Sequence, residues 1–326
     1  MNTAHHAARR AHFDVLVIGT PCLDLVFAGL PHWPIPGQEL YVERFGISAG
    51  AAFNTAATLS RLGLRVALLC ELGNDLFSRY ILEEMERASI SRDLVLVREH
   101  ARQAVSVALV HEGERGFVSY TDTPGGFASQ LARTTAMHGA DTLSEELSAL
   151  LASCDFDAAF LYVHPGLPSL LDAIAERQAT IFFDTGWHPE VLADPRMPAV
   201  VARGDYMLPN QAEAMFMTGT ETAEEAVRVL AKLLPVAVVK VGARGAIACQ
   251  QAELTYCPAF AVKEVLDTTG AGDAFNAGFI YGVLKGYSLP ESLRCGTICG
   301  SLSTTALTGT AAVPTAQTLE ELRAGS

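Results

Sequence analysis

The run Gly270-Ala271-Gly272-Asp273 joins small residues to one carboxylate, which is the composition of an anion-binding turn that carries a reactive group. Glycine and alanine let a ligand approach the backbone closely. An amphipathic helix is predicted to follow, with a core face made of Ala277, Ile280, Tyr281 and Leu284. The first N–H groups of a helix have no partner within it, and the helix dipole adds about half a positive charge there. Gly270, Ala271 and Gly272 therefore predict a site for an anion such as phosphate.

Asp273 has two interpretations. A carboxylate in the first turn of a helix stabilises the helix dipole, and this is the commoner role of a lone aspartate. Beside a bound phosphate, however, a carboxylate repels the ligand. It is then useful as a general base, which accepts the proton of a hydroxyl group that attacks the phosphate.

A second candidate site lies near the N-terminus, in the segment SAGAAFNTA from Ser48 to Ala56. The segment predicts the end of a strand, a turn of small residues and the start of a helix. Small residues again permit close approach to the backbone, and Asn54 can both donate and accept hydrogen bonds to a polyol. Taken alone, an asparagine at this position is more typical of a polar helix face.

The same region raises the alternative of a serine hydrolase. Gly46-Ile47-Ser48-Ala49-Gly50 matches the Gly-x-Ser-x-Gly pattern, in which a sharp strand-to-helix turn exposes a nucleophilic serine. Ser48 lies early in the chain, however, and no glycine-rich oxyanion segment precedes it. Five histidines follow it without a distinctive setting: His100, His111, His138, His164 and His188. The hydrolase is therefore the weaker hypothesis.

Other motifs with a known chemistry are missing from the sequence. It contains no phosphate-binding loop of the Gly-x-x-x-x-Gly-Lys-Ser/Thr type, no dinucleotide-binding glycine pattern after the first strand, and no zinc or calcium motif. The seven cysteines are odd in number and scattered. They are best explained as small buried hydrophobic residues of a protein in the reducing cytoplasm.

Short apolar runs alternate with segments of helical spacing along most of the chain. Strands buried on both faces are predicted at 15–18, 66–70, 158–163, 180–183 and 236–241, and helices at 51–62, 76–88, 211–218 and 222–233. Gly219 suits the end of a helix. This alternation predicts an α/β fold whose mostly parallel sheet is covered on both faces by helices.

Two regions interrupt this alternation. Residues 26–47 contain three prolines and then a strand-like run at 40–45. Residues 104–120 predict a hairpin, because apolar residues alternate with small ones over 105–109 and the glycine-rich turn EGERG joins two β-rich runs. A small β-sheet added to the main domain is expected from these segments. Residues 1–12 are predicted to be a disordered leader, with the domain occupying 13–326.

The composition excludes several classes of protein. Of the 326 residues, 50% are hydrophobic and 18% are charged, which excludes intrinsic disorder. The net charge of −13 argues against a protein that grips nucleic acid, since phosphate contacts need clustered Lys and Arg. No apolar run reaches the ~18 residues of a membrane span. A few backbone N–H groups can still bind a small phosphate ligand on an acidic protein.

Several motifs together resemble the ribokinase (PfkB) family of carbohydrate kinases. The segment DTTGAGDAFNAGF, residues 267–279, resembles the family's C-terminal signature. Four other segments agree with the family in the same order. They are the lid segment Pro-x-Pro-Gly at 34–37, the N-terminal signature at 49–56, Asn-x-x-Glu at 210–213, and the strand–Gly-x-x-Gly nucleotide segment at 239–245. The resemblance covers residues 13 to about 315.

The resemblance implies a three-layer α/β/α sandwich with a β-sheet lid formed by about 26–47 and 104–120. It also implies Mg²⁺-dependent transfer of the γ-phosphoryl group of ATP to an alcohol. Asp273 is then the base, and Gly270, Ala271 and Gly272 form the anion hole. The resemblance also implies that the substrate is bound by Asp24, Gly50 and Asn54, and that the nucleotide is bound by Asn210, Lys240, Gly242, Gly245 and Thr297. Glu213 is implied to bind Mg²⁺ through water. Asp267 and Thr269 match positions that bind a monovalent cation, with K⁺ as the candidate.

The substrate stays open at this level. Ala49 replaces the first of two glycines that the family's N-terminal signature usually has. A nucleoside kinase of the same family shares every motif, and a sensor that binds a sugar or nucleotide without catalysis is an alternative of a different class. Exposed edges of the lid strands favour a homodimer.

Overall fold

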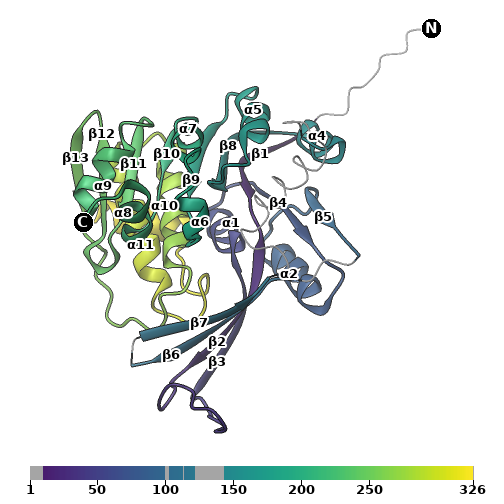
Figure 1. Cartoon of the computed structure of the whole chain (residues 1–326), viewed down its shortest axis with the longest axis vertical. Helices are drawn as coiled ribbons and strands as arrows, with labels where there is room; N and C mark the ends of the chain where they lie inside the picture. Colours follow the sequence, from purple (N-terminus) through teal and green to yellow (C-terminus); the bar gives the residue numbers. More distant parts are fainter. Residues whose placement is uncertain (1–9, 100–102, 113, 122–142, 326) are drawn as a thin grey trace.

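Nine strands form a central sheet in which the first strand of the chain lies beside a strand from its middle (Figure 1). The structure is a computed structural model that describes residues 10–99, 103–112, 114–121 and 143–325. From edge to edge the strands are β13 (Glu253–Cys257), β12 (Ala246–Gln250), β11 (Val236–Lys240), β10 (Tyr206–Met207), β9 (Thr180–Asp184), β8 (Cys154–Tyr162), β1 (Ala11–Ile18), β4 (Val66–Leu72) and β5 (Val95–Val97). Strands β11 to β5 in this order are parallel, and β12 and β13 are antiparallel.

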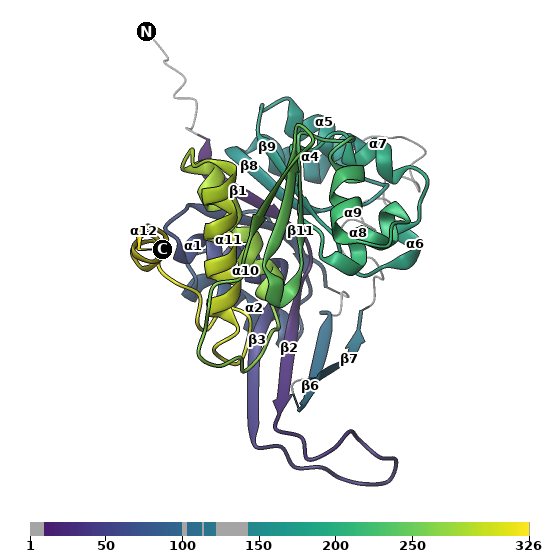
Figure 2. The ribbon, with the colours of Figure 1, turned by 90° about the vertical axis from the view of Figure 1, so that its left-hand side faces the viewer.

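Helices cover both faces of the sheet, so the predicted three-layer α/β/α sandwich is confirmed (Figure 2). One face is covered by α1 (Ala52–Arg61), α2 (Leu76–Arg87), α10 (Ala271–Leu284) and α11 (Leu289–Ser303), with α12 (Ala316–Ala324) against α11. The other face is covered by α4 (Glu145–Ala152), α5 (Pro168–Ala175), α6 (Pro189–Leu192), α7 (Met197–Val201), α8 (Gln211–Thr218) and α9 (Ala223–Leu230).

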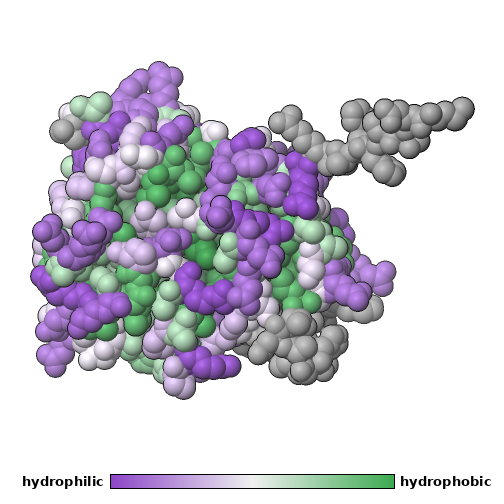
Figure 3. Space-filling model, turned by 90° about the horizontal axis from the view of Figure 1, so that it is seen from above, coloured by the Kyte–Doolittle hydropathy of each residue, from purple (hydrophilic) through white to green (hydrophobic). Residues whose placement is uncertain are grey.

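The period of two along each strand explains why the sheet needs both layers. In β1, Val15 and Val17 belong to one hydrophobic cluster, while Leu16 and Ile18 belong to the cluster on the other face. Successive side chains of a strand point to opposite faces, and a strand that is apolar throughout must bury both. Hydrophilic side chains surround the hydrophobic ones that show at the end opposite the small sheet (Figure 3). Within the described ranges, no helix is long and apolar enough to cross a membrane.

A separate four-stranded sheet projects from one end of the sandwich (Figure 2). Its strands, in the spatial order β3-β2-β6-β7, are β3 (Arg44–Ala51), β2 (Pro21–Ala28), β6 (Val105–His111) and β7 (Glu114–Tyr120). The predicted hairpin of residues 104–120 is confirmed as the antiparallel pair β6–β7. We call these four strands the small sheet.

Three boundaries differ from the prediction. The strand predicted at 40–45 begins only at Arg44, because β3 pairs over its whole length with β2, up to Ala51 opposite Pro21. The small sheet therefore extends beyond the predicted segment 26–47 at both ends. In addition, β1 begins at Ala11, inside the predicted leader, because Ala11 pairs with Cys154. Residues 1–9 of that leader lie outside the described residues.

Helix α10 is buried nearly all round, so the prediction of an amphipathic helix with one core face is wrong. Its neighbours α1 and α11 pack on opposite flanks, and the residues from Ala274 to Gly282 are all buried. Glycine permits this close packing. A Cβ atom on Gly278 would lie only 2.5 Å from the carbonyl oxygen of Cys295 in α11.

The nucleophile-elbow interpretation of Ser48 is also wrong. Ser48 lies within β3, where it pairs with Asp24, and the strand continues for three more residues. The junction between strand and helix is made by Ala51 instead, which has φ 52° and ψ −127°. This backbone conformation favours glycine, because the Cβ atom of other residues clashes there.

We expect Ala51→Gly to raise the free energy of unfolding by about 1 kcal/mol, because it removes the strain of a positive φ. Denaturant titration of both proteins at one pH measures the difference. Ala52→Gly is the matched control, since Ala52 is buried in the first turn of α1 with ordinary helical geometry. That variant is expected to lose about 1 kcal/mol. Equal destabilisation by both substitutions would contradict the strain assigned to Ala51.

Candidate active site

Polar side chains gather where the parallel strands end. Tyr162 ends β8, Asp184 ends β9, Asn210 follows β10 and Lys240 ends β11. The carboxyl ends of parallel strands meet at one edge of a sheet, which is where α/β proteins bind ligands. The N-terminus of α10, with Asp273 in its first turn, completes the site from the helical layer.

Asp273 is held by two side chains from different parts of the fold. Its Oδ2 accepts a hydrogen bond from Asn54 Nδ2 at 3.2 Å, and its Oδ1 accepts one from the Tyr162 hydroxyl at 3.2 Å. Burial, and then the negative charge of Asp184, raise the pKa of Asp273 to about 7, against the opposing effect of Lys240. The carboxylate is therefore a fixed group whose proton affinity suits transfer near neutral pH.

Lys240 and Asp184 form a buried ion pair beside Asp273. Lys240 Nζ lies 2.8 Å from Asp184 Oδ2, and both side chains are almost wholly buried. Asn276 completes the group by donating to Asp184 at 2.5 Å and accepting from Lys240 at 3.1 Å. The remaining oxygen of Asp184 accepts the backbone N–H of Thr185 at 2.8 Å. Because its partners are fixed, the ammonium of Lys240 is held in one position.

Asn210 and Glu213 form the capping box of α8. The Asn210 side chain accepts from the backbone of Glu213, and Glu213 Oε2 accepts from the backbone of Asn210, both at 3.0 Å. Glu213 also accepts a hydrogen bond from Thr185 Oγ1 at 2.5 Å. Its pKa is raised by burial and by the nearby charge of Asp184. The pair therefore has a local structural role besides any contact with a ligand.

The start of α10 has the geometry of an anion site. Gly270 is the residue before the helix and has φ 73°, and a Cβ atom there would lie 2.7 Å from the Cα atom of Gly309. Ala271 and Gly272 then open the helix, with their N–H groups free of helical partners. A Cβ atom on Gly272 would lie 3.4 Å from Lys240 Nζ, so the ammonium and the helix N-terminus face the same place.

A cavity of about 490 Å³ adjoins this anion site, and we call it the nucleotide cavity. Its walls contain most of the residues predicted to bind the anion and nucleotide: Ala271, Gly272, Lys240, Gly242, Gly245 and Thr297. Thr297 is buried at the far wall, where its hydroxyl donates to the carbonyl oxygen of Arg294 at 3.1 Å. Gly245 adopts φ 98°, and a Cβ atom there would lie 2.1 Å from a backbone oxygen. Asn210 and Glu213 are not among the residues that line this cavity.

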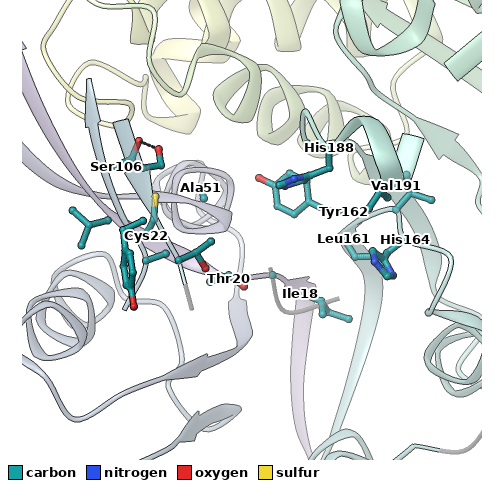
Figure 4. A pocket seen from close by; sticks show the side chains of 18 of the residues that line it. Ile18, Thr20, Cys22, Ala51, Ser106, Leu161, Tyr162, His164, His188 and Val191 are labelled. Carbon is teal, nitrogen blue, oxygen red and sulfur yellow. Dashed lines mark hydrogen bonds between the residues drawn. The ribbon is translucent and has the colours of Figure 1, made fainter. Parts of the chain in front are cut away.

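A second cavity, of about 400 Å³, lies between the small sheet and the carboxyl ends of β1 and β8 (Figure 4). We call it the acceptor cavity. Cys22 lines it, and the thiol of Cys22 donates to Asp24 Oδ1 at 3.0 Å. Burial raises the pKa of Asp24 to about 6. A Cβ atom on Gly50 would lie 1.9 Å from Asp24 Oδ2, so glycine is required opposite this aspartate.

Asp273 lies between the two cavities. Tyr162, which donates to Asp273, lines the acceptor cavity, and Gly272, the neighbour of Asp273, lines the nucleotide cavity. The predicted substrate residue Asn54 contacts Asp273 from α1. The structure thus brings Asp24, Asn54 and the start of α10 together around the same space.

Asp267 and Thr269 shape the loop that precedes the anion site. Asp267 is buried and accepts the backbone N–H groups of Thr269 at 2.8 Å and Thr308 at 3.0 Å. Arg115 of the small sheet donates to Thr269 Oγ1 at 3.4 Å. Their role as ligands of a monovalent cation stays a prediction.

Sequence reasoning assigned no role to Tyr162, Asp184, Thr185 or Asn276, although each contacts a predicted site residue. The first three lie at or just after the ends of β8 and β9. A search for polar residues at the carboxyl ends of the predicted strands would have found them. The part played by Asn276 depends on the packing of α10 over β9, which the sequence does not state.

Comparisons with known proteins agree on one family. A family model described as pfkB family carbohydrate kinase matches residues 14–316. An uncharacterized sugar kinase of Archaeoglobus fulgidus is 31% identical over 241 residues, which cover 73% of this chain and 90% of that protein. The ribokinase of Haemophilus influenzae is 24% identical over 314 residues, which cover 94% of this chain and 97% of that protein. The structure of Arabidopsis thaliana ribokinase complexed with ribose and ATP matches with a TM-score of 0.76 at 21% identity. The match covers 96% of this chain and 99% of that one.

The raised pKa of Asp273 predicts how stability depends on pH. In the folded protein the carboxyl keeps its proton up to a pH of about 7, whereas in the unfolded chain it ionises near 4. Folding therefore takes up a proton between these values, and Asp273 makes the protein less stable as the pH rises from 4 to 8. The free energy of unfolding of the wild type minus that of Asp273→Asn should fall by about 2–4 kcal/mol over this range.

Urea titrations of both proteins at pH 4 to 8, extended down to pH 2 for the control variant below, measure this difference, in which other titrating groups cancel. Asp194→Asn is the control of opposite sign, because hydrogen bonds from Arg196 lower the pKa of Asp194 to about 2. Relative to that variant, the wild type gains stability as the pH rises from 2 to 4. A difference for Asp273→Asn that does not change with pH would contradict the raised pKa.

Proposed function

Because the chain belongs to the pfkB family of carbohydrate kinases, we propose that it transfers the γ-phosphoryl group of ATP to a hydroxyl group of a sugar or sugar-like small molecule. The observation that carries this proposal is the position of Asp273 between the two cavities, next to the N-terminus of α10. A base at that point reaches an acceptor on one side and a phosphate chain on the other.

In the proposed reaction Asp273 accepts the proton of the acceptor hydroxyl. The hydroxyl oxygen bonds to the γ-phosphorus while the bond from that phosphorus to the bridging oxygen breaks, so ADP leaves with the electron pair. We propose that the N–H groups of Gly270 and Gly272 bind the transferring group and that Lys240 adds a positive charge; the N–H of Ala271 donates to the carbonyl oxygen of Thr268 at 3.2 Å. Phosphoryl transfer depends mainly on such positioning and charge stabilisation.

The charges of the site fit a divalent cation. The charge of Asp184 raises the pKa of both Glu213 and Asp273, and Lys240 is the cationic side chain that the described structure places near all three. An added cation would balance the excess of negative charge. We propose that Asn210 and Glu213 hold Mg²⁺ through water, and that Asp267 and Thr269 hold a monovalent cation such as K⁺. Mg²⁺ supplies neutralisation of the phosphate charges when it is bound.

The acceptor is proposed to lie against the small sheet. Asp24 and Asn54 offer hydrogen-bonding groups to its hydroxyls, and Gly50 leaves space beside Asp24. The small sheet, with the predicted lid segments 26–47 and 104–120, then covers the acceptor. Excluding water matters here, since water competes with the hydroxyl group for the phosphoryl group.

Asp273→Asn tests the proposed base. The variant cannot accept the proton, so we expect its turnover number to fall by about 10²-fold or more while ATP binding is kept. ADP release measures the turnover, and calorimetric titration with ATP and Mg²⁺ measures the binding. Asp93→Asn, an exposed aspartate far from both cavities, is the control and should keep wild-type turnover. Near-normal turnover of Asp273→Asn would remove the catalytic assignment.

A non-catalytic sensor remains the alternative of a different class. The position of Asp273 argues against it, because a carboxylate beside a phosphate weakens simple binding. Absence of ADP release across a panel of sugars and nucleosides would favour the sensor. The seven cysteines are free thiols, which supports our proposal that the protein works in the cytoplasm.

We further propose that the chain forms a homodimer through the small sheet. Strand pairing places Ile47, Leu25, Val107 and Val118 in one row across all four strands. This row lies on the face opposite Asp24, and Ile47 and Val118 are 43% and 66% exposed. An exposed apolar sheet face with two open edges is suited to a second copy of itself.

Val118→Lys tests the dimer, because it places a charge in the apolar row. Sedimentation velocity should show a dimer for the wild type and a shift toward monomer for the variant. Val97→Lys, on β5 of the central sheet, is a matched control of similar exposure (57%) and should stay dimeric. A wild-type protein that sediments as a monomer at every concentration would contradict the proposal.

A further inference from the structure

A row of polar side chains crosses the small sheet beside the acceptor cavity, and two of its members line that cavity. Strand pairing aligns Ser48, Asp24, Ser106 and Ser119 side by side across the small sheet. The hydroxyls of Ser106 and Ser119 lie 2.9 Å apart, and both residues line the cavity. The buried hydroxyl of Ser48 has no hydrogen-bond partner among the described residues. We call these four residues the polar row, and the hydroxyls of Ser106 and Ser119 can form hydrogen bonds with the hydroxyl groups of a polyol in the cavity.

The opposite wall of the same cavity is mostly aliphatic, with His164 and His188 beside the aliphatic side chains. Figure 4 shows Leu161, Tyr162 and Val191 facing Cys22 and Ser106 across the space. Four aliphatic side chains contribute to this apolar wall: Leu161, Val163, Leu167 and Val191. The hydroxyl of Tyr162 is already used by Asp273. Hydroxyl groups of a ligand turned toward this wall would lose their hydration without finding partners, which is unfavourable.

The charge of the cavity disfavours an acidic acceptor. The described residues that line it include neither Lys nor Arg. Asp24, a member of the polar row, lies next to the lining because it accepts a hydrogen bond from Cys22. Arg115, a cation on the same face of the small sheet, donates to Thr269 and lies 5.6 Å from the ring of Phe117, outside the lining. A carboxylate on the acceptor would therefore be desolvated without an opposite charge.

We propose that the acceptor is a nucleoside, with its ribose hydroxyls on the polar row and its flat base against the apolar wall. This inference rests on the proposed kinase function and specifies its substrate. A free sugar carries hydroxyls all round its ring and leaves some of them against the aliphatic side chains, whereas a base presents a face with none. His188 at the same wall offers a ring nitrogen to the edge of the base, whereas Nδ1 of His164 accepts the backbone N–H of Gly166 at 3.0 Å.

Two measurements test the substrate class. ADP release is measured with uridine, cytidine, inosine and adenosine, and with ribose, fructose and 2-dehydro-3-deoxygluconate. Binding of the same compounds is measured by calorimetry on Asp273→Asn, which cannot turn over. The best nucleoside should exceed every free sugar by about 10-fold or more in kcat/KM, and the sugar acid should be the poorest acceptor.

The outcomes separate this inference from the function on which it rests. Turnover with ribose, fructose or the sugar acid at higher kcat/KM than with any nucleoside would overturn the inference and keep the kinase. Nucleoside binding to Asp273→Asn without ADP release by the wild type would overturn the kinase and keep the cavity assignment. If the protein neither binds nor phosphorylates any nucleoside, the inference is overturned.

Substitutions in the two walls locate the effect. Ser106→Ala combined with Ser119→Ala should raise KM several-fold for nucleosides and for ribose alike, because both share the ring hydroxyls. Val191→Thr adds a hydroxyl to the apolar wall at nearly constant shape and should reduce the preference for the nucleoside over ribose by about 3-fold or more. Val97→Thr, the same change at an exposed position on β5, should alter neither ratio. An unchanged preference in Val191→Thr would contradict the role of that wall.

Discussion

The organisation of this protein depends on one ammonium group surrounded by carboxylates at the end of a parallel sheet. Lys240 pairs with Asp184, and the charge of Asp184 reaches both Glu213 and Asp273. Burying an ion pair is unfavourable unless hydrogen bonds complete it, and here Asn276 and the backbone of Thr185 do so. Burial, and then the charge of Asp184, raise the pKa of Asp273, while Lys240 opposes this effect.

Much of the fold could be predicted because its signal is local. The apolar strands and the helices between them follow from periodicity, and the five matching motifs identified the residues around α10. The sequence could not show that β3 runs on to Ala51, because that depends on pairing with β2. It could not show that α10 is buried on all sides, because that depends on the close approach of Gly278 to α11.

The site was predictable in its backbone parts and less so in its side-chain partners. Glycines that open a helix indicate an anion site from the sequence alone. Tyr162 and Asp184 carry no local pattern, and they acquire roles only because β8 and β9 end beside α10. The polar row is similar, since Ser106 and Ser119 are ordinary hairpin residues until strand register aligns them with Asp24. Function here depends on non-local pairing as much as on motifs.

The direct passage from β3 into α1 joins the small sheet to the centre of the site. Ala51 ends the strand and Ala52 begins the helix, with no loop between them, and Asn54 in the first turn contacts Asp273. A rotation of the small sheet about this junction would displace Asn54 and with it the hydrogen bond that Asn54 donates to Asp273. In the proposed reaction, covering the acceptor would therefore also change the alignment of the proposed base, through the four residues from Ala51 to Asn54.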